Sequence, residues 1–137
     1  MYLADAAVIV TNPEVSSCRD SDKMVGFINS RSSRAERGEP PVQQTLLVTR
    51  YDADRAARDE MLSVADIQEL LGLPLVGLIP ECRSVLTATN EGTPVICAES
   101  DAATAYDDAV ARLLGEERPM RFAEPRPKGI LERLFQR

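Results

Sequence analysis

Three short apolar runs alternate with segments of helical character along the chain. The runs are Ala6–Val10, Thr45–Thr49 and Leu75–Ile79, and each is followed by a polar or proline-containing loop. Continuous apolar runs of this length are typical of strands that are buried on both faces, as in parallel sheets. The alternation therefore predicts an α/β fold in which helices cover both faces of a parallel sheet, with binding loops beyond the carboxyl ends of the strands.

The spacing of polar and apolar residues between these runs predicts helices. Ser17 is followed by Asp20 at the spacing of a helix-capping box. Ser63 and Asp66 repeat that spacing, and Gly72 stands where the helix after Ser63 should stop. The residues expected to face the core are Met24, Phe27 and Ile28 in a first helix ending near Arg31, Ile67, Leu70 and Leu71 in a second, and Tyr106, Ala109, Val110, Leu113 and Leu114 in a helix over 102–114.

Two shorter elements and a linker complete the expected organisation. Residues 85–90 should form a short helix ending near Gly92, and Pro94–Ile96 a brief edge strand. A segment rich in proline and in charges of both signs follows, which favours an extended linker. The expected division is a body at 1–115, a linker at 116–127 and a separate last segment at 128–137.

Composition excludes several kinds of chemistry. The 137 residues are enough for one domain, and they include no histidine, which removes the usual general base and the usual zinc ligand. Cys18, Cys82 and Cys97 are odd in number and lack CxxC spacing, so we expect reduced thiols. No apolar run approaches the roughly 18 residues of a membrane-spanning helix, and the start of the chain lacks a signal-peptide pattern. These features together predict a cytoplasmic protein.

Charge is distributed unevenly between the body and the tail. Residues 118–137 hold six basic and two acidic side chains, whereas residues 1–117 hold ten basic and twenty acidic ones. An acidic body disfavours nucleic acid, while a basic tail with apolar residues suits an anionic lipid surface. If residues 129–137 are helical, one face is apolar and basic residues flank it, as in an interfacial anchor. The expected membrane-binding residues are Lys128, Ile130, Leu131, Arg133, Leu134 and Phe135. The alternative is a helix packed onto its own body.

Several sequence blocks occur in an order that is characteristic of one protein family. They are TNPEVSS at 11–17, RDSD at 19–22, LVTRY at 47–51, VGLIPE at 76–81, NEGTPVI at 90–96, LLGEERP at 113–119 and GILERLF at 129–135. In this order they resemble the carboxy-terminal half of the MinD family, in the ParA/MinD group of deviant-Walker P-loop ATPases. The resemblance implies a three-layer α/β/α P-loop NTPase-type fold, of which this chain is the second half.

The phosphate-binding loop of that group does not occur in the sequence. No Gly-x-x-x-x-Gly-Lys-Ser/Thr element is present, so nothing in the chain matches the loop that holds the β- and γ-phosphates. The family places this loop upstream of the residue that matches Met1. We therefore interpret the chain as a fragment, a split protein or a misplaced start. ATP and Mg²⁺ are expected in the intact family member, with no tight nucleotide binding and no hydrolysis by this chain alone.

The resemblance also implies a base-binding site formed by loops after two strands. These loops map to Arg50 and to Pro80, Glu81 and Cys82. Arginine can stack on a base, and backbone groups beside a proline can read its edge. The alternative interpretation is that Arg50 is a surface charge and Pro80 a strand terminator. The position of Cys82 is commonly acidic in the family, which leaves its individual role open.

Partner contacts are implied at three further residues. Asp20 and Asp22 lie in the first expected helix, on the surface that in the family meets a MinC-like division inhibitor and a MinE-like regulator. Helix capping is the alternative role for these acids. Asn90 maps near the family's homodimer face, with turn formation as the alternative.

In the family, the ATP-bound dimer attaches to the inner face of the cell membrane, recruits the division inhibitor and so places the septum, and the MinE-like regulator stimulates hydrolysis. Two rival functions stay open for this chain. One is a non-catalytic, membrane-tethered interaction module. The other is a fragment of a partition-type ATPase, which the acidic body disfavours because such proteins commonly bind DNA.

Overall fold

Three parallel strands form the centre of the molecule. The computed structural model describes residues 4–125. Strands β1 (Ala6–Thr11), β2 (Gln43–Tyr51) and β3 (Leu75–Pro80) form one sheet in the order β1-β2-β3, and both pairings are parallel. The three predicted strands and their parallel arrangement are confirmed, although β2 is longer at both ends than the apolar run.

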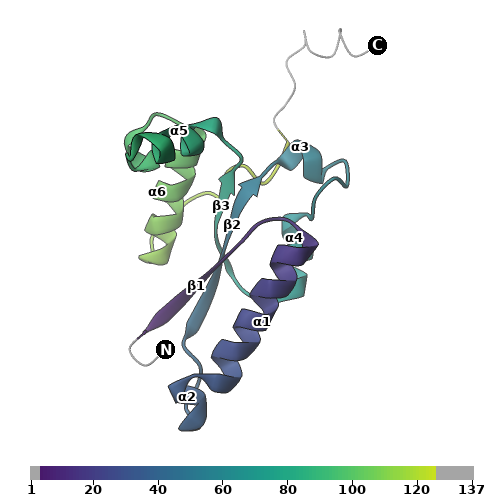
Figure 1. The fold of residues 1–137 in the computed structure, drawn as a ribbon, viewed down its shortest axis with the longest axis vertical. Helices are drawn as coiled ribbons and strands as arrows, with labels where there is room; N and C mark the ends of the chain where they lie inside the picture. Colours follow the sequence, from purple (N-terminus) through teal and green to yellow (C-terminus); the bar gives the residue numbers. More distant parts are fainter. Residues whose placement is uncertain (1–3, 126–137) are drawn as a thin grey trace, which may run out of the picture.

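Helices lie on the two faces of this sheet (Figure 1). They are α1 (Val15–Arg31), α2 (Ser33–Glu36), α3 (Ala53–Ala56), α4 (Val64–Leu71), α5 (Arg83–Glu91), the 3-10 turn η1 (Val95–Cys97) and α6 (Asp101–Leu113). Leu46, Val48 and Leu78 pack with residues of α1 and α4. Leu47 and Ile79 point the other way and pack with α6. The predicted α/β layering is therefore confirmed at β2 and β3.

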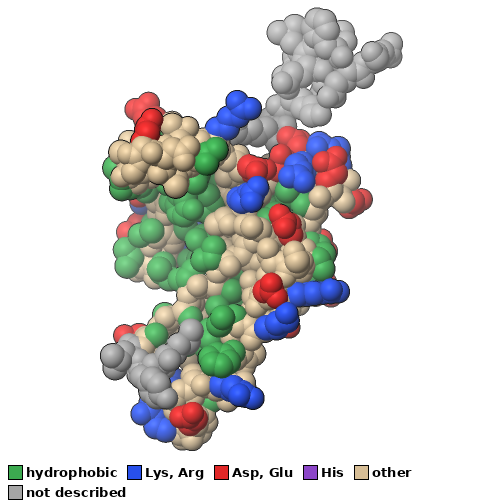
Figure 2. Space-filling view, viewed as in Figure 1, with side chains coloured by type: hydrophobic (Ala, Val, Ile, Leu, Met, Phe, Trp, Pro, Cys, Tyr) green, Lys and Arg blue, Asp and Glu red, His purple; other side chains and the backbone are tan. Residues whose placement is uncertain are grey.

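The outer strand β1 is covered on one face only among the described residues. Ile9 packs with Val25 and Ile28 of α1, whereas Val8 and Val10, which point to the opposite face, are 39% and 56% exposed. Figure 2 shows hydrophobic side chains gathered beside α6 and along β1 on the visible side of the molecule. The expectation that helices cover both faces is thus not met at β1.

Helix α1 begins earlier and buries a different face than predicted. Its N-cap is Glu14, which makes no side-chain capping bond, so the predicted cap at Ser17 is wrong. Pro13 and Glu14 turn the chain directly after β1, with the Glu14 amide donating to the Asn12 carbonyl at 2.8 Å. The buried stripe of α1 is Cys18, Ser21, Val25 and Ile28, while Met24 and Phe27 are about half exposed.

Helix α4 matches its sequence signals. The Ser63 hydroxyl accepts from the Asp66 amide at 3.2 Å, and the Asp66 carboxylate accepts from the Ser63 amide at 3.0 Å. Gly72 ends the helix in the left-handed conformation, with a φ of 62°. Ile67 and Leu71 are buried as predicted, but Leu70 is 54% exposed because the buried stripe is narrower than the apolar one.

The carboxy-terminal third differs in two respects from the sequence prediction. Helix α6 buries its alanines against the sheet, so Val110, Leu113 and Leu114 are exposed instead of buried. The predicted edge strand at 94–96 is also wrong. The chain there folds into the turn η1, with the Cys97 amide donating to the Pro94 carbonyl at 3.0 Å, a bond that an extended strand cannot make.

Candidate functional site

The loops after β2 and β3 meet at the carboxyl end of the sheet. Tyr51 at the end of β2 is in register with Pro80 at the end of β3, and the Glu81 amide donates to the Tyr51 carbonyl at 2.9 Å. Parallel strands bring their carboxyl ends to one edge, so loops distant in sequence become neighbours there. The structure thereby brings together Arg50 and the Pro80–Cys82 segment, the four residues that the family resemblance implied.

An apolar cavity of about 470 Å³ lies beside these loops. Its floor is Ile79 and Pro80, and its walls include Val85 and Leu86 of α5 and Tyr106 of α6. Volumes of this size are typical of small-molecule sites, which combine apolar walls with a few polar groups. At the polar rim lie Arg50, Glu81 and Cys82.

Arg50 occupies an unusual backbone conformation at this rim. Its φ is 57°, in the left-handed region that residues other than glycine seldom adopt. Such conformations cost of order 1–3 kcal/mol and persist where the surroundings over-determine them, often at binding sites. Its guanidinium Nη2 lies 3.3 Å from Glu81 Oε1, with both side chains about half exposed or more. The contact therefore bridges the two loops but contributes little stability by itself.

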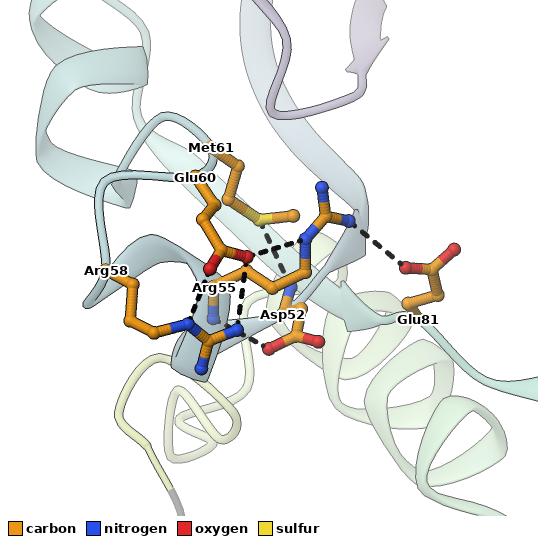
Figure 3. Close-up of polar contacts among 6 residues, drawn as sticks. All are labelled: Asp52, Arg55, Arg58, Glu60, Met61 and Glu81. Carbon is orange, nitrogen blue, oxygen red and sulfur yellow. Dashed lines mark hydrogen bonds and ion pairs between the residues drawn. The ribbon is translucent and has the colours of Figure 1, made fainter.

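Glu81 also belongs to a chain of ion pairs on the outer side of the loops (Figure 3). Arg55 Nη1 lies 3.8 Å from Glu81 Oε2, and Arg55 Nε lies 3.6 Å from Glu60 Oε2. Arg58 donates to both oxygens of the Glu60 carboxylate, at 2.7 and 3.1 Å, which holds the pKa of that carboxyl below its usual value. Asp52 caps the short helix α3 by accepting from the Arg55 amide at 3.0 Å.

These ion pairs border a second hollow of about 500 Å³. Arg50 and Glu81 line both cavities. The second hollow is more polar and includes Glu60 and Asp66 in its wall. The apolar cavity is therefore the better fit for a flat organic ring, because ring burial gains from apolar walls.

Cys82 lies at the start of α5 with its thiol half-buried. The sulfur and the Ser84 hydroxyl oxygen are 2.8 Å apart. This hydrogen bond holds the pKa of the Cys82 thiol below its ordinary value, although partial burial opposes the shift. A polar thiol thus stands at the cavity rim, at the position where the resemblance left the role open.

The three residues with implied partner contacts do not form one cluster. Asp20 and Asp22 are exposed on α1, and the Lys23 ammonium donates to Asp20 at 2.8 Å, which holds the pKa of Asp20 below its usual value. Asn90 is exposed in the last turn of α5, on the face of the sheet where α6 packs. Asp20 also lines a hollow of about 420 Å³ between α1 and the exposed valines of β1.

Two sets of residues complete the comparison with the sequence predictions. The six expected membrane-binding residues, from Lys128 to Phe135, lie outside the described residues. Sequence reasoning missed the pocket walls at Val85, Leu86 and Tyr106, because it had assigned Tyr106 to the core and gave a role in α5 to Asn90 alone. The only feature of the sequence that could have indicated these wall residues is their position in the two helices that follow β3. Within residues 4–125, no helix has the length and apolar character needed to cross a membrane.

Comparison with known proteins places these features in one family. No protein-family model matches the chain. Its sequence is 56% identical to the septum site-determining protein MinD of Escherichia coli K12 over 136 residues, which is 98% of this chain and 50% of that protein. The corresponding MinD of Neisseria meningitidis serogroup B is 53% identical over 136 residues, with the same coverage. The chain corresponds to the carboxy-terminal half of proteins of the MinD family. It spans about half the length of the curated MinD proteins it matches.

Solved MinD structures share the fold. The MinD cell division protein of Aquifex aeolicus superposes with a TM-score of 0.75 and 36% identity, over 86% of this chain and 47% of that protein. MinD in the MinC:MinD complex of the same organism gives the same TM-score and identity, over 86% of this chain and 46% of that one. MinD of Pyrococcus horikoshii, solved with Mg-ADP, gives a TM-score of 0.60 at 26% identity, over 82% of this chain and 43% of that protein. These neighbours are P-loop ATPases of the MinD/ParA type.

Proposed function

We propose that this chain is the base-binding and membrane-attaching half of a MinD-like cell-division ATPase. The observation that carries the proposal is the apolar cavity at the carboxyl ends of β2 and β3, with Arg50 and Glu81 at its rim. In this assignment the adenine enters the cavity, where apolar walls bury the ring and Arg50 stacks on it or donates to it. Pro80 and Cys82 supply the adjoining edge of the cavity. A phosphate loop and its Mg²⁺ belong to the half of the relatives that this chain does not match.

The base site is tested by ligand-detected nuclear magnetic resonance with adenosine and ADP. Without a phosphate loop the affinity should be weak, with a dissociation constant of about 1 mM, equivalent to about −4 kcal/mol. Adenosine and ADP should then bind the chain alike, because only the base is held. Arg50→Ala should weaken both, while Arg37→Ala, which removes an exposed arginine paired with Glu39 far from the cavity, should not. If Arg50→Ala and Arg37→Ala bind adenosine with equal affinity, the assignment is contradicted.

Membrane attachment is assigned to the tail at residues 128–137. The support is its pattern of Ile130, Leu131, Leu134 and Phe135 beside basic residues, together with the match to MinD proteins. Burying four such side chains gives roughly 6–10 kcal/mol before ordering costs. Ordering a short helix costs about 1–2 kcal/mol per residue, so one tail binds weakly. Two tails on a dimer bind more strongly through effective concentration, which gives dimerisation control over attachment.

Sedimentation with anionic vesicles tests this assignment. The full chain should co-sediment with vesicles rich in anionic lipid more than with neutral ones, and the chain without residues 128–137 should not. Leu134→Glu should abolish binding, because it puts a charge on the apolar face. Gln136→Glu is the matched control, since it adds the same charge at a position off that face. Loss of binding in both variants would show that net charge alone matters.

The exposed face of α1 is assigned to partners. Asp20 and Asp22 would meet a MinC-like inhibitor, in line with the solved MinC:MinD complex of Aquifex aeolicus, and a MinE-like regulator would use the same surface. Asn90 would lie near the face of a homodimer. Charge reversal at Asp22 should weaken capture of a MinC-like protein, whereas reversal at Glu36, on the separate helix α2, should not.

A further inference from the structure

Residues 116–125, which follow α6, run across the free edge of the sheet. Met120 and Ala123 pack against the cluster that contains Leu46, Val48 and Leu78. Phe122 packs instead against the cluster of Ile79 and α6, on the opposite face. A segment whose neighbouring residues reach both faces must pass the edge strand, β3. Figure 1 shows it, in yellow, running from the end of α6 past β3 to the side where α3 lies.

Arg112 of α6 fastens the beginning of this segment. Its Nη1 donates to the Val76 carbonyl of β3 at 2.7 Å, and its Nε donates to the Arg118 carbonyl at 3.1 Å. Its Nη2 donates to the Pro119 carbonyl. One guanidinium therefore ties the segment to the edge strand through three backbone carbonyls, a geometry that suits the planar fork of arginine.

The middle of the segment forms an ion pair with a buried carboxylate. Arg121 Nε lies 2.9 Å from Asp108 Oδ2, and Asp108 is only 3% exposed. The N–H does not point at that oxygen, which has no aligned hydrogen-bond donor among the described residues. The contact is therefore an ion pair, and the charge of Arg121 is what compensates the buried carboxylate.

The same segment supports the wall of the candidate base site. Phe122 packs against the buried core of Ile79, Ala102 and Ala105. Three residues of the cavity lining, Cys82, Val85 and Tyr106, pack against the same core. Phe122 has a φ of 65°, a conformation that persists only where surrounding contacts hold it. The docked segment and the cavity wall thus pack against the same buried core.

We propose that residues 116–125 form a strap that couples the cavity at the strand ends to the chain leading into the carboxy-terminal tail. When the strap is docked, Phe122 completes the packing around Ile79, Ala102 and Ala105, against which Val85 and Tyr106 also pack, so the cavity wall is ordered. When the strap is released, the wall loosens. By linkage, a ligand that orders the wall favours the docked strap to the same extent. The coupling itself needs no ligand, and only the identity of the ligand and of the tail rests on the function proposed above.

Hydrogen–deuterium exchange on the full chain, without ligand, tests this coupling. Asp108→Asn removes the ion pair with little change of shape, and Phe122→Ala removes the ring that packs against the shared core. Each should raise exchange of the strap about tenfold, as loss of one buried polar or apolar contact does for local opening. Exchange should rise severalfold in the wall at 83–90, and stay unchanged in α4. Arg118→Gln is the control, because that side chain pairs with Glu116 inside the strap.

Two outcomes would overturn the proposal. One is faster exchange in the strap with no change at 83–90, which would make the strap a separate unit. The other is an equal rise in α4, which would indicate global destabilisation. If Phe122→Ala does not fold, Phe122→Leu replaces it in the experiment, because leucine keeps most of the apolar volume. It should give the same pattern at smaller amplitude.

An adenosine titration separates this inference from the proposed function. Asp108→Asn should weaken adenosine binding about fivefold, the lower end of ordinary coupling between sites. If the unaltered chain does not bind adenosine, the base assignment fails, while the exchange result still decides the coupling. If adenosine binds equally to both proteins, the coupling is overturned and the base site stands.

Discussion

Replacing Gly77 by alanine should separate α6 from the sheet. A Cβ at this position would lie 2.5 Å from the Ala109 Cβ and 2.6 Å from the Leu47 Cδ1. Ordinary contacts of a Cβ are 3.4–4 Å, so each pair must part by about 1 Å. Leu47 can rotate its terminal methyl group away. Ala109 has no such freedom, and its helix must move.

The expected cost follows from two opposing contributions. Overpacking of a well-packed core costs about 1–3 kcal/mol, and a clash with the Ala109 Cβ, which cannot rotate away from its helix, places this case toward the upper end. Alanine also restricts the unfolded chain relative to glycine, which returns about 0.4–1 kcal/mol. The net loss should be about 1–2 kcal/mol. The moved helix carries Tyr106, so adenosine binding should weaken as well.

Urea unfolding followed by circular dichroism measures this cost, with two reference variants. Gly26→Ala adds a methyl group on α1 with no atom within 4 Å, so it should stabilise by about 0.5–1 kcal/mol. Ala109→Gly removes the atom that Gly77→Ala would strike. The double variant should therefore lose less stability than the sum of the single ones. A Gly77→Ala protein as stable as Gly26→Ala, or strictly additive effects, would refute the close approach of α6 and β3.

Three further outcomes are expected. Ser63→Ala should cost about 1 kcal/mol in urea unfolding, because it removes the N-cap of α4. Hydrogen bonds from the Ser63 side chain and backbone lower the pKa of Asp66 from its usual 3.8. The resulting stability is present above that value and is lost as pH falls through the lower folded pKa, so Ser63→Ala should flatten the acid side of a melting-temperature profile. Thr49→Val should cost about 1 kcal/mol in urea unfolding, since it removes the 2.9 Å bond from the Thr49 hydroxyl to Asn12 Oδ1.

Local signals were sufficient to locate β1, β2, β3 and α4. A short apolar run predicts a strand, and the run at 75–79 needs no distant partner to be recognised. Burial on both faces was correct for β2 and β3 but not for β1, where Val8 and Val10 are exposed. The capping box at Ser63 and the stop at Gly72 are likewise complete within a few residues. Each of these signals is complete within a few residues, although the strands themselves pair with segments distant in the sequence, as Ala6 does with Gln43. For that reason their positions could be read from the chain alone.

The candidate site was predictable only in part. Arg50 and Pro80 are placed by the ends of strands, and family resemblance named them before the structure brought them together. The walls at Val85 and Tyr106 depend on how α5 and α6 return over β3, which no short pattern encodes. The contacts of residues 116–125 could not be read from a short sequence pattern either. Proline and mixed charge describe the segment locally, whereas Arg121 finds its counter-charge on α6 and Phe122 its neighbours around the cavity.

The wrong prediction of the buried face of α6 has a physical explanation of its own. The rule that large apolar residues point inward assumes that all partners of a helix are present. Here the alanines of α6 meet the sheet because Gly77 permits close approach, and Val110, Leu113 and Leu114 are left 48–76% exposed. Val8 and Val10 of β1 are exposed as well. In relatives about twice as long, further structure is available to cover such surface. The rule is therefore expected to fail where an apolar stripe, such as Val110 and Leu113, is not buried by the described residues.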